Sequence, residues 1–117
     1  MIRKTYQTGL AAERLCRLAL RLKFYRILAT RYKTPMGEID IVAARGNTVV
    51  AVEVKARATR DAAAFSISRE QQSRIANALQ YFIMSTPRYA RAHFRFDVML
   101  ATPWHWPAHV KNAWLAE

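Results

Sequence analysis

The sequence predicts a single α/β domain built around a β-hairpin, and three observations support this prediction. Residues 37–43 and 49–55 alternate apolar and polar side chains with a period of two, which is typical of β-strands. Gly46 and Asn47 lie between the two runs, and both residue types tolerate the positive φ angles of tight hairpin turns. One segment with helical periodicity precedes the hairpin and another follows it. At 117 residues, the chain has the length of one domain.

The register of the hairpin decides which side chains face each other. If Gly46 and Asn47 form the loop, Arg45 pairs with Thr48, and counting back along both strands sets Asp40 opposite Glu53. A loop of four residues gives the same pairing. A slip of one residue would instead turn Asp40 toward the opposite face of the sheet.

Two carboxylates that lie opposite each other on one face of a sheet repel. A divalent cation removes this repulsion, and oxygen atoms are the ligands that Mg²⁺ prefers. Lys55 lies two residues beyond Glu53 and projects from the same face, where it could orient an attacking water or stabilise charge on a phosphate. Asp40, Glu53 and Lys55 therefore predict a metal-dependent phosphodiesterase site, with Mg²⁺ or Mn²⁺ as the cofactor.

A simpler interpretation is a solvent-facing hairpin with mixed charges. The predicted register sets Glu38 opposite Lys55, and Lys55 could also pair with Glu53. This interpretation does not explain why Asp40 and Glu53 oppose each other.

Five sequence blocks, which span nearly the whole chain, carry a resemblance to a known family. They are residues 9–13 (GLAAE), 37–40 (GEID), 52–55 (VEVK) with Arg57, 95–98 (RFDV) and 109–113 (HVKNA). In these blocks and their order the chain resembles the YraN family of small bacterial proteins, which are described as endonucleases related to Holliday-junction resolvases. Its hairpin resembles that of the PD-(D/E)xK nuclease superfamily. The resemblance implies a restriction-endonuclease-like core, with a mixed central sheet flanked by helices.

The resemblance also adds two residues to the site. First-helix glutamates in this superfamily reach toward the metal, which implies that Glu13 is a third ligand; an intrahelical ion pair with Arg17 is the alternative. Gln71 stands where the family commonly has lysine, and some superfamily members use a polar helix residue near the scissile phosphate. A capping box with Ser68 would explain Gln71 without any catalytic role.

The charge of the chain indicates a polyanionic partner. Lys and Arg number 19 against 8 Asp and Glu, which gives a formal charge of +11. Such a surplus favours nucleic acid first and an anionic membrane surface second. The basic residues that could contact phosphate, or could be ordinary surface charges, are Arg17, Arg31, Lys33, Arg57 and Arg74.

Other classes of protein are disfavoured. No apolar run approaches the roughly 18 residues that span a membrane, and no secretory signal is recognisable. A single cysteine, Cys16, fits a reducing bacterial cytoplasm. The three histidines lack the spacing of zinc ligands, and three glycines without a glycine-rich loop do not suggest a nucleotide-binding fold.

The remaining elements follow from periodicity and from turn residues. In chain order they are a loose basic arm at residues 1–8, a helix from 9 to about 24, a strand from 24 to about 32, an irregular segment at 58–67, a helix from the N-cap Ser68 to about 84, a strand at 94–100, a short strand within 104–110 and a helical turn from 112. Asp97 is expected to bind Arg95 or the backbone rather than a metal. The aromatic side chains of Phe94 and Phe96 are expected to be buried.

These features predict a Mg²⁺-dependent DNA endonuclease that acts on branched or single-stranded DNA in repair or recombination. A DNA-binding module that keeps the nuclease fold without cutting, or cuts only with a protein partner, fits the charge equally well. A basic RNA-binding scaffold would instead need stacking aromatic residues on an exposed sheet. Symmetric cutting of a four-way junction would need a homodimer, and the sequence leaves the oligomeric state open.

Overall fold

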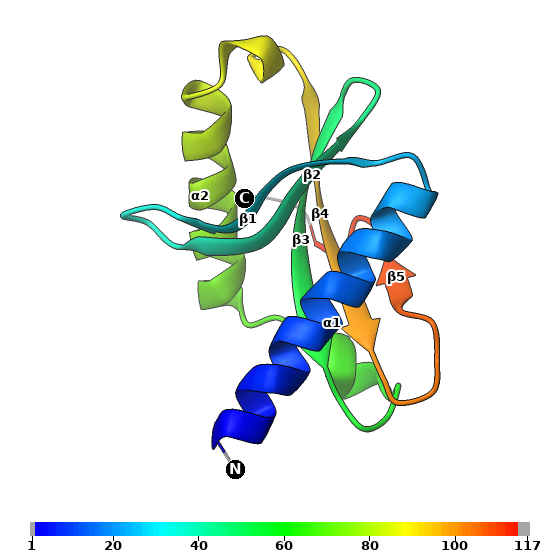
Figure 1. The fold of residues 1–117 in the computed structure, drawn as a ribbon. Helices are drawn as coiled ribbons and strands as arrows, with labels where there is room; N and C mark the ends of the chain where they lie inside the picture. The colour runs from blue at the N-terminus through cyan, green and yellow to red at the C-terminus, as the bar shows by residue number, and fades with distance from the viewer. Residues whose placement is uncertain (1, 115–117) are drawn as a thin grey trace.

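The computed structural model describes the backbone of residues 2–114 and the side chains of residues 9–114. The protein folds into a mixed β-sheet with one α-helix packed on each face (Figure 1). Its elements are α1 (Ile2–Leu22), β1 (Arg26–Lys33), β2 (Glu38–Arg45), β3 (Thr48–Ala56), η1 (Ala62–Phe65), α2 (Arg69–Met84), η2 (Pro87–Tyr89), β4 (His93–Ala101) and β5 (Ala108–Val110). The strands lie in the order β1-β2-β3-β4-β5. β3 and β4 run parallel, and the other neighbours run antiparallel. The predicted α/β class and mixed sheet are confirmed.

The sheet separates two apolar cores, because alternate side chains of a strand point to opposite faces. In β3, Val49 and Ala51 pack into the core beneath α2. Val50 and Val52 pack into the core beneath α1, which also contains the fully buried Cys16. The central strand is therefore covered on both faces.

Strand β2 breaks this alternation at Asp40. In a regular strand Ile39 and Ile41 would face the same side. Here Ile39 packs into the core beneath α2, whereas Ile41 packs into the core beneath α1. The pairing of β2 with β3 ends at Ile41 and Val52, immediately before the two acids. The strands therefore part at the position where the sequence predicts the site.

The hairpin has the predicted register, with Arg45 paired to Thr48. Gly46 supplies the positive φ angle that the turn needs, at 59°. The predicted strand pairings of Asp40 with Glu53 and of Glu38 with Lys55 were wrong, because the β2–β3 ladder ends before both. Glu38 pairs instead with Lys33 of β1.

The chain ends and the aromatic residues of β4 differ in part from expectation. Helix α1 begins at Ile2 rather than at Gly9. The basic arm was predicted at residues 1–8, and the side chains of these residues lie outside the described part of the chain. The terminal turn predicted from Asn112 also extends past residue 114, beyond the described part.

Phe96 is buried as predicted, but Phe94 is 56% exposed, so the predicted burial of Phe94 was wrong.

Gly37 lies against helix α2 just before β2 begins. A Cβ atom added there would lie 3.0 Å from both the Cβ and the carbonyl oxygen of Arg74. We therefore expect Gly37→Ala to lower the free energy of unfolding by about 1–3 kcal/mol, because a methyl group would enter a close-packed contact. Urea unfolding followed by circular dichroism measures this change.

The control for this prediction is Gly9→Ala within α1, where nothing lies within 4 Å of the added Cβ. Alanine there should leave stability unchanged or raise it by up to about 1 kcal/mol, because it favours the helix. Equal losses in the two variants would contradict the proposed contact with α2.

Neither helix in the described part of the chain is both long and apolar enough to cross a membrane.

Candidate functional site

Asp40 is fixed at the point where β2 and β3 separate. The backbone N–H of Val54 donates a hydrogen bond to Asp40 Oδ2 at 2.8 Å. The carboxylate thus satisfies a strand N–H that lies beyond the end of the β2–β3 ladder. This contact holds the Asp40 carboxylate beside β3 at the level of Glu53.

Glu53 has the environment of an acid that resists ionisation. Burial raises its pKa most, and a hydrogen bond with Asp40 and the negative charge of Asp40 raise it further, to about 9. The ammonium group of Lys55 and a hydrogen bond with the Gln71 side chain act in the opposite direction. Four side chains singled out in the sequence therefore interact at one place. The neutral Glu53 carboxyl can donate a hydrogen bond to the Asp40 carboxylate.

A pocket of about 320 Å³ opens beside Asp40, between α1 and the ends of the strands. Its lining residues are Gly9, Ala12, Glu13, Arg31, Lys33, Glu38, Asp40, Val54 and Ala56. Glu13 and Asp40 therefore reach the same space from different elements. The pocket combines acidic and basic side chains, as a site that binds both a cation and a phosphate requires.

Glu13 is 8% exposed, and its carboxylate is bound by Arg31. Arg31 Nη2 lies 2.9 Å and Arg31 Nε 3.1 Å from Glu13 Oε2. Arg31 has a φ angle of 49°, which is unusual for a residue other than glycine. The sequence suggested Arg17 or a metal as the partner of Glu13, and it carries no signal for the backbone conformation of Arg31.

The donor atoms fit a magnesium ion that is bound through two carboxylates. Within residues 9–114, no three Asp, Glu, His or Cys side chains converge closely enough to enclose a metal. Mg²⁺, however, commonly keeps several waters and is bound through one or two carboxylates together with substrate phosphate. Asp40 and Glu53 can supply these two carboxylates. Glu13 could join them after leaving Arg31.

The predicted phosphate contacts fall into two groups. Arg31 and Lys33 line the pocket, as a role in binding substrate would require. Arg17, Arg57 and Arg74 are not among its lining residues. Arg57 is exposed beyond the end of β3 and donates a hydrogen bond to a neighbouring backbone carbonyl, whereas Arg74 is ion-paired one turn along α2.

Gln71 forms one half of the predicted capping box. Its backbone N–H donates to Ser68 Oγ at 3.1 Å, which confirms Ser68 as the N-cap of α2. The side chain of Gln71 hydrogen-bonds Glu53. The first turn of α2 is thereby connected to the acidic pair.

We expect Glu53→Gln to stabilise the protein in the absence of metal. The raised pKa of Glu53 means that its contribution to stability is present below its unfolded pKa of about 4.5 and is lost as the pH rises toward 9. Glutamine cannot ionise and can still hydrogen-bond Asp40. The variant should match the wild type near pH 4 and exceed it by roughly 1–3 kcal/mol at pH 8.

Urea unfolding at both pH values in the presence of chelator measures this difference. The control is Glu70→Gln, which removes an exposed acid ion-paired with Arg74 and should change stability by less than about 0.5 kcal/mol. A Glu53→Gln variant that is less stable than the wild type at pH 8 would show that ionised Glu53 is well stabilised without metal.

Comparisons with other proteins agree with the sequence blocks. Residues 12–101 match the family described as "Uncharacterised protein family UPF0102". A UPF0102 protein of Parvibaculum lavamentivorans is 48% identical over 109 residues, which cover 93% of this chain and 82% of that relative. A UPF0102 protein of Chelativorans sp. is 46% identical over 113 residues, covering 97% and 91%. The chain therefore belongs to the UPF0102 family, the YraN family that its sequence blocks indicated.

Proposed function

We propose that the protein is a metal-dependent DNA endonuclease with Mg²⁺ as its cofactor. One observation carries the proposal: a chain with a formal charge of +11 places two of its eight acids in contact at the end of a hairpin. Burial and the negative charge of Asp40 both oppose the ionisation of Glu53. A bound cation would instead favour the ionised carboxylates, so binding a cation explains why the two acids lie in contact.

The residues of the site have separate roles in this proposal. Asp40 and Glu53 would hold the cation, which when bound can lower the pKa of water and stabilise charge on a phosphate. Lys55 would orient the attacking water or contact a phosphate oxygen. Glu53 would lose its proton when metal binds, because a carboxylate ligand must be ionised.

The basic residues of the pocket support a nucleic-acid substrate. Arg31 and Lys33 lie in the same pocket as Asp40 and could bind the phosphates on either side of the scissile bond. The resemblance of the sequence blocks to a family described as endonucleases related to Holliday-junction resolvases extends the proposal to branched or single-stranded DNA in repair or recombination. Such a substrate would place the activity in the bacterial cytoplasm.

The ion pair between Glu13 and Arg31 favours a second candidate function. While Arg31 holds both contacts to Glu13 Oε2, this oxygen is not available to a metal ion. A protein in this state would bind DNA without cutting it. Cutting would begin only when DNA, a second copy of the chain or a repair protein draws Arg31 away.

A cleavage assay on labelled single-stranded, nicked, flap and four-way-junction DNA tests the proposal. We expect at least one substrate to be cut in the presence of Mg²⁺ or Mn²⁺ and none to be cut in chelator. Binding without cutting on every substrate, with either metal, would contradict the endonuclease proposal. The DNA-binding module would then be the better description.

A further inference from the structure

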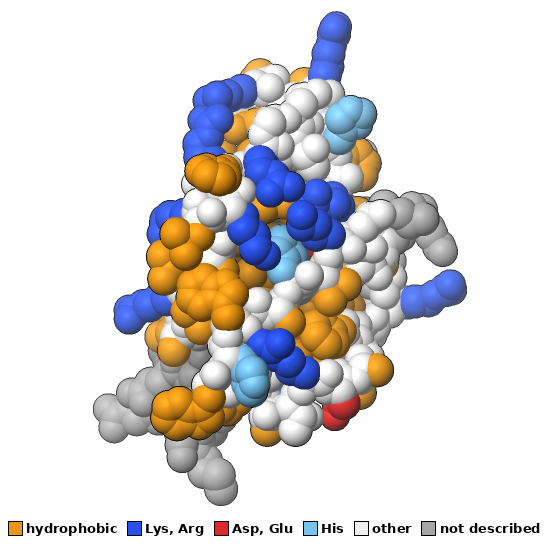
Figure 2. All heavy atoms as spheres, turned by 90° about the vertical axis from the view of Figure 1, so that its right-hand side faces the viewer, with side chains coloured by type: hydrophobic (Ala, Val, Ile, Leu, Met, Phe, Trp, Pro, Cys, Tyr) orange, Lys and Arg blue, Asp and Glu red, His pale blue; other side chains and the backbone are white. Residues whose placement is uncertain are grey.

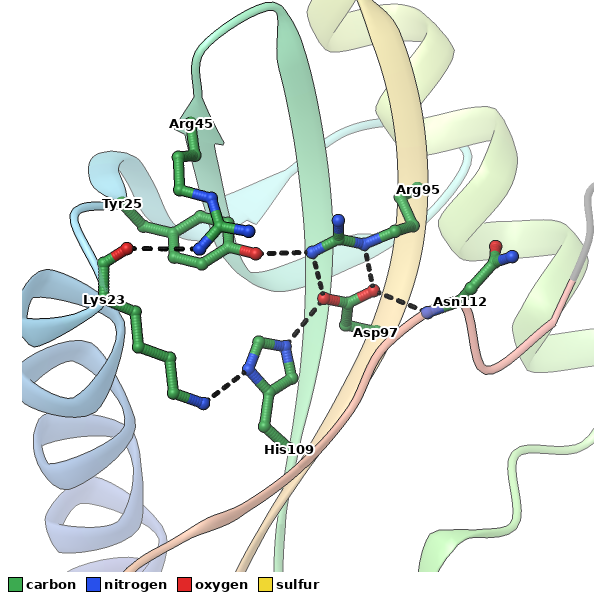
Figure 3. A network of polar contacts seen from close by, with 7 residues as sticks. All are labelled: Lys23, Tyr25, Arg45, Arg95, Asp97, His109 and Asn112. Atoms are coloured by element: carbon green, nitrogen blue, oxygen red, sulfur yellow. Dashed lines mark hydrogen bonds and ion pairs between the residues drawn. The ribbon is translucent and has the colours of Figure 1, made fainter.

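A second charged cluster lies where the C-terminal end of α1 meets β5. Figure 2 shows Lys and Arg side chains gathered around a histidine ring on the face that carries these elements. Seven residues are joined there by polar contacts (Figure 3), and we call them the Asp97 network: Lys23, Tyr25, Arg45, Arg95, Asp97, His109 and Asn112. None of the seven lines the pocket beside Asp40.

Asp97 anchors the network. Its side chain is 0% exposed and accepts two hydrogen bonds from Arg95, both at 2.8 Å. His109 Nε2 lies 2.7 Å from Asp97 Oδ2, and the backbone N–H of Asn112 donates to Oδ1 at 2.9 Å. Burial alone would raise the pKa of Asp97, but the hydrogen bonds from His109 and Arg95 outweigh it and lower the pKa to about 2. Asp97 is therefore a fixed negative charge that is fully hydrogen-bonded.

His109 connects this buried carboxylate to Lys23. The Nζ atom of Lys23 lies 3.1 Å from His109 Nδ1. A lysine ammonium group can only donate, so Nδ1 must accept and the ring proton must lie on Nε2, which faces Asp97. The imidazole is then uncharged. Its contact positions the ammonium group without neutralising it.

Arg45 is positioned by the same group of residues. Its Nη1 atom donates to the carbonyl oxygen of Lys23 at 3.2 Å, and its guanidinium carbon lies 4.4 Å from the centre of the Tyr25 ring. The Tyr25 hydroxyl is in turn bound by Arg95 at 2.6 Å. The exposed guanidinium of Arg45 is thus held beside Lys23 by a backbone carbonyl and an aromatic ring, neither of which carries a charge.

The charges of the network do not balance. Three cations, Lys23, Arg45 and Arg95, face the single carboxylate of Asp97, and Arg95 uses that carboxylate bidentately. Within residues 9–114, neither Lys23 nor Arg45 is paired with an acid. Lys23 and Arg45 therefore carry two positive charges that the network positions but no acid among these residues compensates, an arrangement that an anion would stabilise.

We propose that Lys23 and Arg45 bind the phosphate backbone of nucleic acid at a second site, separate from the acidic pair. Ammonium and guanidinium groups both donate hydrogen bonds to phosphate oxygens. Lys23 directly follows α1 and lies ten residues beyond Glu13, which corresponds to about 15 Å along the helix axis. At the axial rise of about 3.4 Å per nucleotide in duplex DNA, roughly four nucleotides of one strand span this distance.

The choice of nucleic acid as the ligand rests on the proposed function, whereas the binding test needs no cleavage. Fluorescence anisotropy of labelled single-stranded and four-way-junction DNA, with the full chain in chelator and at several salt concentrations, measures affinity. Arg45→Gln and Lys23→Gln should each weaken binding about 3- to 10-fold. Each should also reduce the slope of log affinity against log salt by about 0.7–0.9, as expected for the loss of one phosphate contact.

The matched control is Arg88→Gln. Arg88 is also an exposed arginine over a tyrosine ring, 5.6 Å from the centre of Tyr89, but it belongs to η2 and lies outside the network. Its replacement should change affinity by less than about two-fold and leave the salt slope unchanged. Circular dichroism would verify that all three variants are folded.

A direct readout distinguishes local binding from a general loss of charge. In wild-type protein, the NMR signals of the imidazole nitrogens of His109 should shift when a short oligonucleotide is added. The reason is that a phosphate bound to the Lys23 ammonium group would weaken its hydrogen bond to His109 Nδ1. Lys23→Gln should abolish this shift.

Two results would overturn the proposal. One is equal loss of affinity in Arg45→Gln and Arg88→Gln. The other is binding to phosphatidylglycerol vesicles that depends on Arg45 while DNA affinity does not. Since every measurement is made in chelator, an inactive Asp40 site would leave these results unaffected, and failure of the two proposals can be told apart.

Discussion

Replacing Asp97 by asparagine should destabilise the protein by about 3–5 kcal/mol. The substitution removes the charge that pairs with Arg95 and leaves a guanidinium group, only 21% exposed at its side chain, without a counter-ion. It also weakens the contacts that attach His109 and Asn112, and with them the segment that forms β5. Urea unfolding at pH 7 measures the loss. Glu70→Gln, which removes an exposed ion pair, is the control and should cost less than about 0.5 kcal/mol.

The pH dependence of this difference provides an independent check. The folded pKa of Asp97 is lowered from 3.8 to about 2, so its contribution is present above pH 3.8 and is lost as the pH falls toward 2. The stability gap between wild type and Asp97→Asn should therefore narrow across this interval. A gap that is absent at pH 7, or that does not narrow in acid, would argue against a stabilising charge at Asp97.

Asp40→Asn should lower DNA cleavage by at least about 1000-fold, while the affinity for DNA stays within about two-fold. The substitution removes an anionic ligand of the proposed metal, whose charge supplies several kcal/mol of transition-state stabilisation. An asparagine oxygen can still accept the hydrogen bond from Val54 N–H, so the strands should keep their positions. Single-turnover cleavage of the preferred substrate measures the effect.

The control for Asp40→Asn is Glu38→Gln, since Glu38 lines the same pocket but is exposed and has no proposed role in metal binding. We expect its cleavage rate to stay within a few-fold of the wild type. Lys55→Ala should reduce cleavage by about 100- to 1000-fold if the lysine acts on the water or phosphate. Full activity in Asp40→Asn would exclude Asp40 as a ligand of the catalytic metal.

The proximity of Asp40 and Glu53 could be predicted from the sequence. Period-two alternation and the Gly46-Asn47 turn predicted the register, and the structure has Arg45 opposite Thr48 as counted. The change of face at Asp40 could not be predicted, because Ile39 and Ile41 are identical residues that suit either core. Which core each one enters depends on the packing of α1 and α2, which local patterns do not encode.

Long-range contacts were predicted only in part. Arg95 and Asp97 are two residues apart on one face of a strand, and their ion pair was expected. The ring of His109 reaches Asp97 from 12 residues away, and Lys23 precedes His109 by 86 residues in the sequence. Those contacts depend on the path of β5 beside β4. The ion pair of Arg31 with Glu13 likewise depends on a backbone conformation that arginine rarely adopts.

Cys16 gives the fold a built-in chemical reporter. Its side chain is fully covered in the core beneath α1, where burial, helped by the negative charges of Asp40 and Glu13, raises the pKa of the thiol to about 12. Thiol reagents attack the thiolate, so they can label this cysteine only in molecules in which α1 has lifted from the sheet. The helix that exposes the thiol also carries Glu13. The rate of thiol labelling thus reports how often α1, which lines one side of the pocket beside Asp40, separates from the sheet.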